Sequence, residues 1–208
     1  MSAQADPTST KPSGRYHHGD LANALRSATL ELVAEAGVTG FTMKDAAVLA
    51  GVSAAAPYRH FSDREDLLRS AAVAPYARLV EAFDAVQDHD PVQRLGGMMA
   101  AFVAWAAAEP AAHAIVFSPG IDKHEAPDLD ALGTRATALI LGAADEIAGE
   151  DAPTLMVSAY AIAQGHAAVL ADPQIATSGL PCTPADLITM TRRAVVALAE
   201  SSRRPSDV

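Results

Sequence analysis

The sequence has few of the features that mark secreted, membrane-spanning or disulfide-linked proteins. Cys182 is the only cysteine among 208 residues, so no disulfide can form within the chain. No apolar run reaches the roughly 18–20 residues of a membrane span, because glycine, proline or charge interrupts each one. The N-terminus lacks the basic and then apolar order of a signal peptide. We therefore expect a soluble, cytoplasmic protein in which Cys182 is a bystander rather than a redox sensor.

Residue patterns typical of catalysis or metal binding are also missing. His89, His113, His124 and His166 are scattered without ligand spacing, and the sequence has no HExxH or Cys/His motif. No serine or cysteine lies in a recognisable nucleophile setting. The sequence therefore predicts no enzyme, no metal site and no cofactor.

Basic residues are outnumbered, and the formal net charge is −10. The deficit is uneven, because residues 1–70 hold seven Lys and Arg against eight Asp and Glu, whereas the remaining residues hold eight against seventeen. Salt screens exposed charges beyond ~8 Å, so an acidic C-terminal part need not repel an anion bound to the N-terminal part. The net charge does not exclude a nucleic-acid partner.

No strand alternation or internal repeat is present, and helical signals run through the chain. Residues 1–14 are polar and predict a disordered arm. Asp20 is a candidate N-cap for a helix that ends at Gly37. Apolar residues on one face of this helix are Leu21, Leu25, Ala28 and Leu32.

Two short helices and a long one are expected next. Thr42-Met-Lys-Asp45 is a capping box that opens a helix of about seven residues ending before Gly51. After a three-residue turn, Ser53 is expected to cap a second short helix. Ser62-Asp-Arg-Glu65 reads as another capping box, opening a long helix. A short helix, a glycine-containing turn and a second short helix are typical of a helix-turn-helix, whose second helix enters the DNA major groove.

Prolines divide the rest of the chain. Pro75 should kink the long helix, and the other prolines fall where helices begin. The expected helices lie near 91–108, 110–117, 127–149, 152–170 and 184–200, with irregular stretches at 118–126 and 171–182. We therefore predict an all-α protein with a helix-turn-helix domain at 15–70, a helical bundle at 71–200 and a tail at 201–208.

Side chains around the predicted helix-turn-helix suit a phosphate backbone. Thr42 and Ser53 sit at expected helix N-termini, where free amides and the helix dipole favour anions. Tyr58 and His60 add a hydroxyl and an imidazole, and Arg64 adds a cation. The alternative is purely structural: the two rings pack a small bundle, Arg64 pairs with Glu65 or Asp20, and the alanines are close-packed spacers.

The order and spacing of these residues resemble the DNA-binding domain of the tetracycline-repressor-like (TetR) family of bacterial regulators. The matching residues are Thr42, Ala47, Ala50-Gly51-Val52-Ser53 and Tyr58-x-His60-Phe61-x-x-Arg64-Glu65-x-Leu67. The resemblance covers roughly residues 15–70. It implies an all-helical homodimer with an N-terminal DNA-binding domain and a C-terminal domain that binds an effector and dimerises.

The resemblance also implies roles for single residues. Phosphate-contacting positions are Thr42, Lys44, Ser53, Tyr58, His60 and Arg64, and groove-facing positions are Ala54, Ala55 and Arg59. The chain departs from the family at Ala46, which replaces a bulky aliphatic residue, and at Val48 and Leu49, which replace polar ones. The arm residues Arg15 and Tyr16, with the two histidines after them, either reach DNA or stay in solvent.

Alanines at the groove-facing positions cannot hydrogen-bond a base edge. Their methyl groups let a helix sit deep in the major groove and contact thymine methyls. We therefore expect specificity to come from Arg59, Lys44, the arm and DNA shape.

Residues beyond about 75 resemble more weakly the C-terminal domain of a TetR branch named for a Trp-His-Gly pattern. The matching positions are Tyr160, Gln164 and Gly165, so two of the three residues differ. Large side chains in this alanine-rich bundle are candidates to line an effector cavity, the alternative being ordinary core packing. The candidates are Met98, Phe102, Trp105, Phe117, Tyr160, Gln164 and His166.

Helices near 152–170 and 184–200 match the dimerising pair of the family. The expected interface residues are Leu155, Ala159, Ile162, Leu187, Met190 and Ala194. The sequence thus predicts a repressor that binds a pseudo-palindromic operator as a homodimer and is released by a small-molecule effector through the long helix with Pro75. The alternative is a helical small-molecule-binding or carrier protein without DNA binding, whose lack of salt-dependent DNA affinity would distinguish it.

Overall fold

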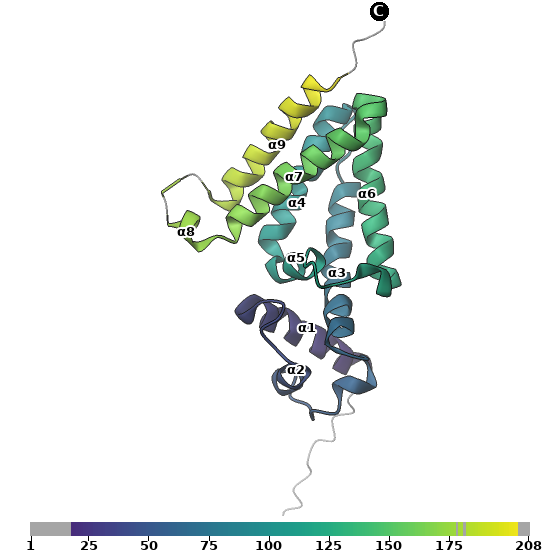
Figure 1. Ribbon diagram of the computed structural model, residues 1–208, viewed down its shortest axis with the longest axis vertical. Helices are drawn as coiled ribbons and strands as arrows, with labels where there is room; N and C mark the ends of the chain where they lie inside the picture. Colours follow the sequence, from purple (N-terminus) through teal and green to yellow (C-terminus); the bar gives the residue numbers. More distant parts are fainter. Residues whose placement is uncertain (1–17, 178, 181, 204–208) are drawn as a thin grey trace, which may run out of the picture.

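The computed structural model describes residues 18–177, 179–180 and 182–203, and all regular structure in these ranges is helical (Figure 1). The expected arm, including Arg15 and Tyr16, lies outside the described residues, as does the tail beyond 203. The helices are α1 (His18–Ala36), α2 (Met43–Leu49), η1 (Pro57–Arg59), α3 (Arg64–Asp84), α4 (Pro91–Ala108), α5 (Pro110–Val116), η2 (Lys123–Glu125), α6 (Pro127–Ala148), η3 (Gly149–Asp151), α7 (Ala152–Leu170), α8 (Pro173–Ala176) and α9 (Pro184–Ser201). The prediction of an all-α fold is confirmed.

α1, α2 and the start of α3 form a small unit at one end of the molecule (Figure 1). Its core includes the fully or almost fully buried Leu25, Phe41, Ala46, Phe61 and Leu67. α1 begins at His18, so the prediction that Asp20 is its N-cap is wrong, and Asp20 lies within the first turn.

The predicted capping box of α2 is confirmed. The Asp45 amide donates to the Thr42 hydroxyl at 3.3 Å, and the Thr42 amide donates to the Asp45 carboxylate at 2.8 Å. α2 ends at Leu49, and the chain turns at Gly51, whose φ of +70° is a conformation that glycine adopts without strain. The amides of Gly51 and Val52 then bond the carbonyls of Val48 and Ala47, which closes the helix and turns the chain.

The segment after this turn differs from the prediction. Ser53 does not begin an α-helix, because a turn over residues 54–56 leads instead into the 3-10 helix η1. An α-helix starting at Ser53 would need the residue 57 amide to bond the Ser53 carbonyl, and Pro57 has no amide hydrogen. The Ala56 amide bonds the Ser53 carbonyl at 2.9 Å, and the His60 amide bonds the Pro57 carbonyl at 2.9 Å. This i to i−3 bonding is the pattern of a 3-10 helix.

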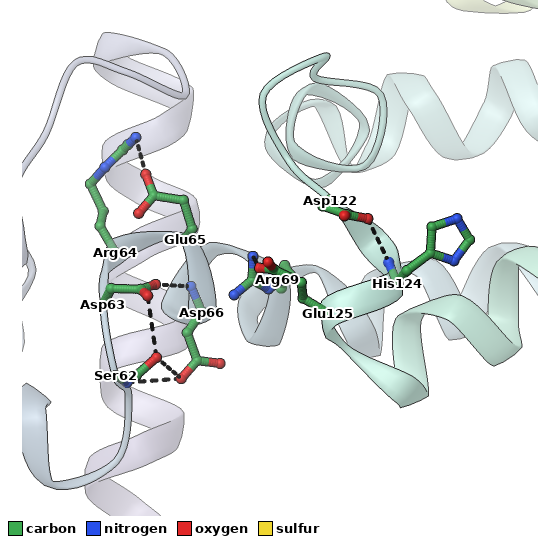
Figure 2. A network of polar contacts seen from close by, with 9 residues as sticks. All are labelled: Ser62, Asp63, Arg64, Glu65, Asp66, Arg69, Asp122, His124 and Glu125. Atoms are coloured by element: carbon green, nitrogen blue, oxygen red, sulfur yellow. Dashed lines mark hydrogen bonds and ion pairs between the residues drawn. The ribbon is translucent and has the colours of Figure 1, made fainter.

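The start of α3 is also one residue later than expected. Asp63, not Ser62, is the N-cap, and its carboxylate accepts the Asp66 amide at 2.7 Å. The Asp66 carboxylate in turn accepts the Ser62 amide at 2.9 Å, so two carboxylates cap the helix (Figure 2). α3 then continues through Pro75 without a break. The Pro75 carbonyl also accepts the indole N–H of Trp105 at 2.7 Å, which ties α3 to α4.

The C-terminal bundle surrounds α4, which packs against α3, α6, α7 and α9 (Figure 1). α4 and α9 approach closely at Gly96, where a Cβ atom would lie 2.7 Å from Val196 Cγ2. The N-terminal unit joins the bundle through α3 and through contacts of α1 with α5. In the described part of the chain no single helix could cross a membrane by length and composition, and α4 with α5 meets that test only as a pair bent by 111°.

Candidate DNA-binding surface and internal cavity

The structure exposes most of the side chains expected to meet DNA. Those on α2, the following turn and η1 that face solvent are Thr42, Lys44, Ser53, Ala54, Ala55, Tyr58 and Arg59. Tyr58 has 60% of its surface exposed, although Pro57 beside it is buried. His60 is half-buried, with its ring 6.3 Å from that of Phe61. One short turn thus anchors its proline in the core and turns the phenol and guanidinium of the next two residues outward.

α2 contributes apolar as well as charged groups to this surface. Val48 is 69% and Leu49 47% exposed, at the positions where the sequence departs from the family pattern. Ala46 is fully buried in the small core, which explains its apolar character. Exposed aliphatic groups beside Lys44 suit a surface that a partner covers.

Arg64 is held inside the N-terminal unit rather than extended into solvent. Its guanidinium pairs with the Glu65 carboxylate at 2.9 Å (Figure 2). It also donates to the Val38 carbonyl and lies 5.5 Å from the centre of the Phe41 ring. The structural alternative of a pair with Glu65 is therefore present. Arg64 clamps the loop between α1 and α2 onto the first turn of α3.

Capping also affects the charge of this surface. Hydrogen bonds from Thr42, first from its hydroxyl and then from its amide, hold the pKa of the exposed Asp45 carboxyl below its usual value. Asp45 is therefore ionised at neutral pH and stays engaged with the N-terminus of α2.

A cavity of about 520 Å³ lies within the bundle, a size that suits a small organic ligand. It is lined by residues of α3, α4, α6, α7 and η2 and by Phe117, which follows α5. The lining residues are Tyr76, Leu79, Phe83, Phe102, Phe117, Lys123, His124, Leu129, Asp130, Gly133, Thr134, Ala136, Thr137, Ile140, Met156, Val157 and Tyr160. Three of the expected effector residues, Phe102, Phe117 and Tyr160, are among them.

The other four expected effector residues do not line this cavity. Met98 is buried in the core of the bundle, and Trp105 lies behind the wall, 6.1 Å from the Phe102 ring and bonded to α3. His166 faces α9, where its Nδ1 lies 2.7 Å from the Thr191 hydroxyl. Gln164 supports the wall from behind through a hydrogen bond to Tyr160. Whether each of these side chains faces the cavity depends on how its helix packs against the neighbouring helices. The periodicity of apolar residues in the sequence does not reveal that packing.

A chain of polar side chains stands behind the cavity wall. The Gln164 amide donates to the Tyr160 hydroxyl oxygen at 2.5 Å, and its carbonyl oxygen lies 2.9 Å from His113 Nε2. Burial lowers the pKa of His113, which keeps the imidazole neutral. Burial also raises the pKa of Tyr160, and burial together with Tyr160 raises that of Tyr76 to about 12. Both phenols are therefore protonated hydrogen-bond donors at neutral pH.

The mouth of the cavity is formed by residues that the sequence did not reveal. Lys123 Nζ lies 5.5 Å from the centre of the Phe117 ring, and His124 Nδ1 lies 2.8 Å from the Asp130 carboxylate. Both basic residues belong to η2, in the stretch expected to be irregular. The one residue in the sequence that could have indicated this helical turn is Asp122. Its carboxylate caps the turn by accepting the His124 amide at 3.0 Å (Figure 2).

The third residue of η2 connects the cavity mouth to the N-terminal unit. Glu125 pairs with Arg69 of α3, its carboxylate 2.7 Å from Nη1 (Figure 2). The Arg69 side chain is only 8% exposed, and its Nε has no hydrogen-bond partner among the described residues. Glu125 is thus the described countercharge of a buried guanidinium near the root of the helix-turn-helix.

The expected dimer interface is partly misplaced. Leu155, Ala159 and Leu187 are buried inside the subunit, because α7 and α9 turn these residues toward α4 and toward each other, and Ile162 is half-buried. The three buried residues are unavailable to a partner, whereas Met190 and Ala194 are exposed. The outward residues of the two helices include Ala161, Gly165, Ala168, Met190, Ala194 and Ala197.

Comparisons with known proteins agree with this architecture. The family model for bacterial regulatory proteins of the tetR family matches residues 25–71. A comparison with curated protein sequences gave no match.

Several solved structures share the fold over nearly the whole chain. A protein of unknown function from Rhodococcus sp. RHA1 is 24% identical, with a TM-score of 0.71 over 92% of this chain and 100% of that one. A tetR-family regulatory protein from Rhodococcus RHA1 is 17% identical, with a TM-score of 0.68 over 89% and 98%. The regulator FadR of Bacillus subtilis, solved in complex with stearoyl-CoA, is 14% identical, with a TM-score of 0.67 over 88% and 99%.

The N-terminal unit therefore resembles the DNA-binding domain of the tetR family of bacterial regulatory proteins, and the whole chain shares its fold with solved tetR-family regulators. The resemblance to this family that the sequence predicted for residues 15–70 is confirmed by the match over residues 25–71. None of these comparisons identifies the Trp-His-Gly branch. Among the described residues, no group of three His, Cys, Asp or Glu side chains could hold a metal ion.

Proposed function

We propose that this protein is a cytoplasmic transcriptional repressor that binds a pseudo-palindromic operator as a homodimer and is released by a small-molecule effector. Residues 15–70 would bind DNA, and residues 71–200 would bind the effector and dimerise. The observation that carries the proposal is the exposed surface of α2, the turn and η1, where Lys44, Tyr58 and Arg59 project from a helix-turn-helix of TetR type.

Some of these residues would contact the phosphate backbone, and others would contact the bases in the major groove. The α2 N-terminus with Thr42, together with the Tyr58 hydroxyl and Lys44, supplies phosphate donors. Arg59 and the two exposed alanines, Ala54 and Ala55, face the groove, where methyl groups permit close approach to thymine. Ser53 and His60 are further phosphate contacts, and Arg64 orients this surface through its clamp.

A homodimer would form through the outward faces of α7 and α9. Both helices pack on α4, so their opposite faces point away from the bundle together (Figure 1). Small residues such as Ala161, Gly165 and Ala194 on these faces allow the helices of a second copy to approach closely. A two-fold axis through this pair would present two reading surfaces to half-sites about one DNA turn (~34–36 Å) apart.

Effector release would pass through η2. A ligand in the cavity would contact Lys123 and His124, and the same turn carries Glu125, the partner of Arg69 in α3. Displacement of η2 would therefore change how the root of α3 is held. The effector must bind the DNA-free arrangement more tightly than the DNA-bound one for this to shift the equilibrium.

Selection of bound duplexes from a random pool tests the proposal. We expect a two-fold symmetric consensus with half-sites one helical turn apart. An effector screen on the selected duplex then tests release. Failure to enrich any sequence would contradict the DNA-binding part of the proposal.

A ligand carrier without DNA binding is the second candidate, and the cavity alone would suit it. The two candidates differ in salt response, since a protein that neutralises several phosphates loses DNA affinity steeply between 50 and 200 mM salt, by about 10³-fold or more for six contacts. A carrier would show no such dependence.

A further inference from the structure

One buried and one half-buried tyrosine, from different helices, line the cavity of the bundle. Tyr76 of α3 is 5% exposed, and Tyr160 of α7 is half-buried. No described residue forms a hydrogen bond with the Tyr76 hydroxyl, which lines the cavity. Because this hydroxyl opens into the cavity and uses its hydrogen for no described residue, a molecule or water in the cavity can accept that hydrogen. The Tyr76 hydroxyl is therefore a donor available to a bound molecule.

Tyr160 is prepared for the same role by the residues behind it. Its oxygen accepts the Gln164 amide at 2.5 Å, so its own hydrogen is not used in that bond. The orientation of Gln164 is fixed because its carbonyl oxygen faces His113 Nε2 at 2.9 Å, and a neutral imidazole protonated there donates to it. The chain from His113 to Tyr160 thus leaves the Tyr160 hydrogen free for an acceptor in the cavity.

Charged groups of the lining are confined to the mouth. They are Lys123 and His124 of η2 and Asp130 in the first turn of α6, and the last two are paired with each other. The remaining lining residues are apolar, aromatic, glycine or hydroxyl-bearing. An ionised group placed deep in this cavity would have no countercharge, which is strongly unfavourable.

Aromatic rings form much of the inner wall. Phe102 lies 5.6 Å from Phe117 and 5.9 Å from Tyr160, both in edge-to-face arrangements. Such a wall offers ring faces and edges to an aromatic ligand.

We propose that the cavity binds a neutral, largely aromatic molecule through an uncharged acceptor oxygen, such as a carbonyl, which receives hydrogen bonds from the hydroxyls of Tyr76 and Tyr160. This ligand class rests on the proposed role of the cavity as the effector site.

Three probes that share two phenyl rings on one carbon test the ligand class. Benzophenone carries a carbonyl at that carbon, diphenylmethane carries none, and diphenylacetate carries an anionic carboxylate. Their dissociation constants are measured by equilibrium dialysis against the full-length protein and against Tyr76→Phe, Tyr160→Phe and the double variant. Thermal unfolding of each variant, followed by circular dichroism, shows that it is folded.

The wild-type protein is expected to bind benzophenone about 3- to 10-fold more tightly than diphenylmethane for each hydrogen bond made, and diphenylacetate most weakly. Each phenylalanine variant should lose affinity for benzophenone and keep its affinity for diphenylmethane. Comparing the two probes in each variant separates the contribution of the tyrosine hydroxyl to affinity from the effect of any change in cavity shape.

Three results would overturn the ligand class: tightest binding of diphenylacetate, equal binding of benzophenone and diphenylmethane, or equal losses for both probes in the variants. In those cases the cavity still binds ligands, and its proposed role as an effector site stands. If no probe binds, both the ligand class and the effector role of the cavity fail. Selection of duplexes decides the DNA-binding proposal independently.

Discussion

Tyr58 and Arg59 project from a turn that is held in place by the residue before them. Pro57 is buried, lacks an amide hydrogen and favours the tight geometry of η1, so the two following side chains have little backbone freedom. Preorganisation of this kind lowers the ordering cost of binding. A single proline thus determines where the proposed DNA-reading surface places its phenol and its guanidinium.

Substitutions at these neighbouring positions should separate anchoring from reading. Tyr58→Phe removes a phosphate donor and should weaken binding by a similar factor, about 3- to 10-fold, for all duplexes. Arg59→Ala should weaken the selected operator more than its single-base variants, because a groove-facing arginine contributes ~1–3 kcal/mol of discrimination. Electrophoretic mobility shifts on the operator and a set of single-base variants measure both effects. Equal discrimination by Arg59→Ala and the wild type would contradict the groove-facing assignment.

The α2 cap should make stability depend on pH. Hydrogen bonds from Thr42 lower the pKa of Asp45 in the folded state, so they stabilise the fold above the unfolded pKa of about 3.9. This contribution is lost as the pH falls through the folded pKa. Asp45→Asn should therefore lower the melting temperature at pH 7, and the gap to the wild type should narrow toward pH 3. A gap that stays constant over that range would contradict the assignment.

At the scale of elements, helix boundaries followed from the sequence where a proline or a cap marks the first turn. α4, α5 and α9 begin at the prolines that predicted them, and α2 begins at its capping box. These signals are local, because they depend on which residue lacks an amide hydrogen or offers an oxygen to one.

The failures at this scale also have local causes. Ser53 is a good N-cap residue, but Pro57 removes the first hydrogen bond of the helix that it would have capped. Ser62 and Asp63 compete for one helix start, and the carboxylate of Asp63 takes the cap. Residue preferences indicate that either residue could be the N-cap. Only the hydrogen bonds of the folded chain show which one is used.

The link between η2 and α3 predicts an effect on DNA binding from a residue distant from DNA. Glu125→Gln should weaken the pair with the buried Arg69, loosen the root of the helix-turn-helix and lower operator affinity several-fold. Asp128→Asn is the matched control, since it removes an exposed carboxylate three residues further along the chain. Both substitutions remove one negative charge, so they change the overall attraction to DNA equally. A difference between their dissociation constants for the selected duplex, measured by fluorescence anisotropy, therefore reports the contact between Glu125 and Arg69. Equal dissociation constants for the two variants would exclude it.

At the scale of the whole molecule, the sequence predicted the architecture better than the orientation of each helix within it. The candidates Phe102, Phe117 and Tyr160 line the cavity, while His166 and Trp105 face neighbouring helices. The expected interface residue Leu187 faces inward for the same reason. An alanine-rich helix has apolar residues around most of its circumference, so its pattern alone does not identify the buried face.

The corrected faces predict how the proposed dimer can be disrupted. Ala161→Lys with Ala194→Lys places charges on the outward faces of α7 and α9 and should convert the dimer to a monomer. Ala138→Lys, on the exposed side of α6, should leave the assembly unchanged. Sedimentation velocity reports the assembly, and operator affinity should fall with dimerisation. A dimer that survives the double substitution would mean that the interface lies elsewhere.

The salt dependence of operator binding tests the central claim most directly. We predict that the affinity of the full chain for its selected duplex falls linearly with salt on a log–log plot, with a steep slope from several phosphate contacts. Lys44→Ala should reduce that slope by about 1, as expected for the loss of one contact. Affinity that does not change between 50 and 200 mM salt would contradict the account of this chain as a DNA-binding regulator.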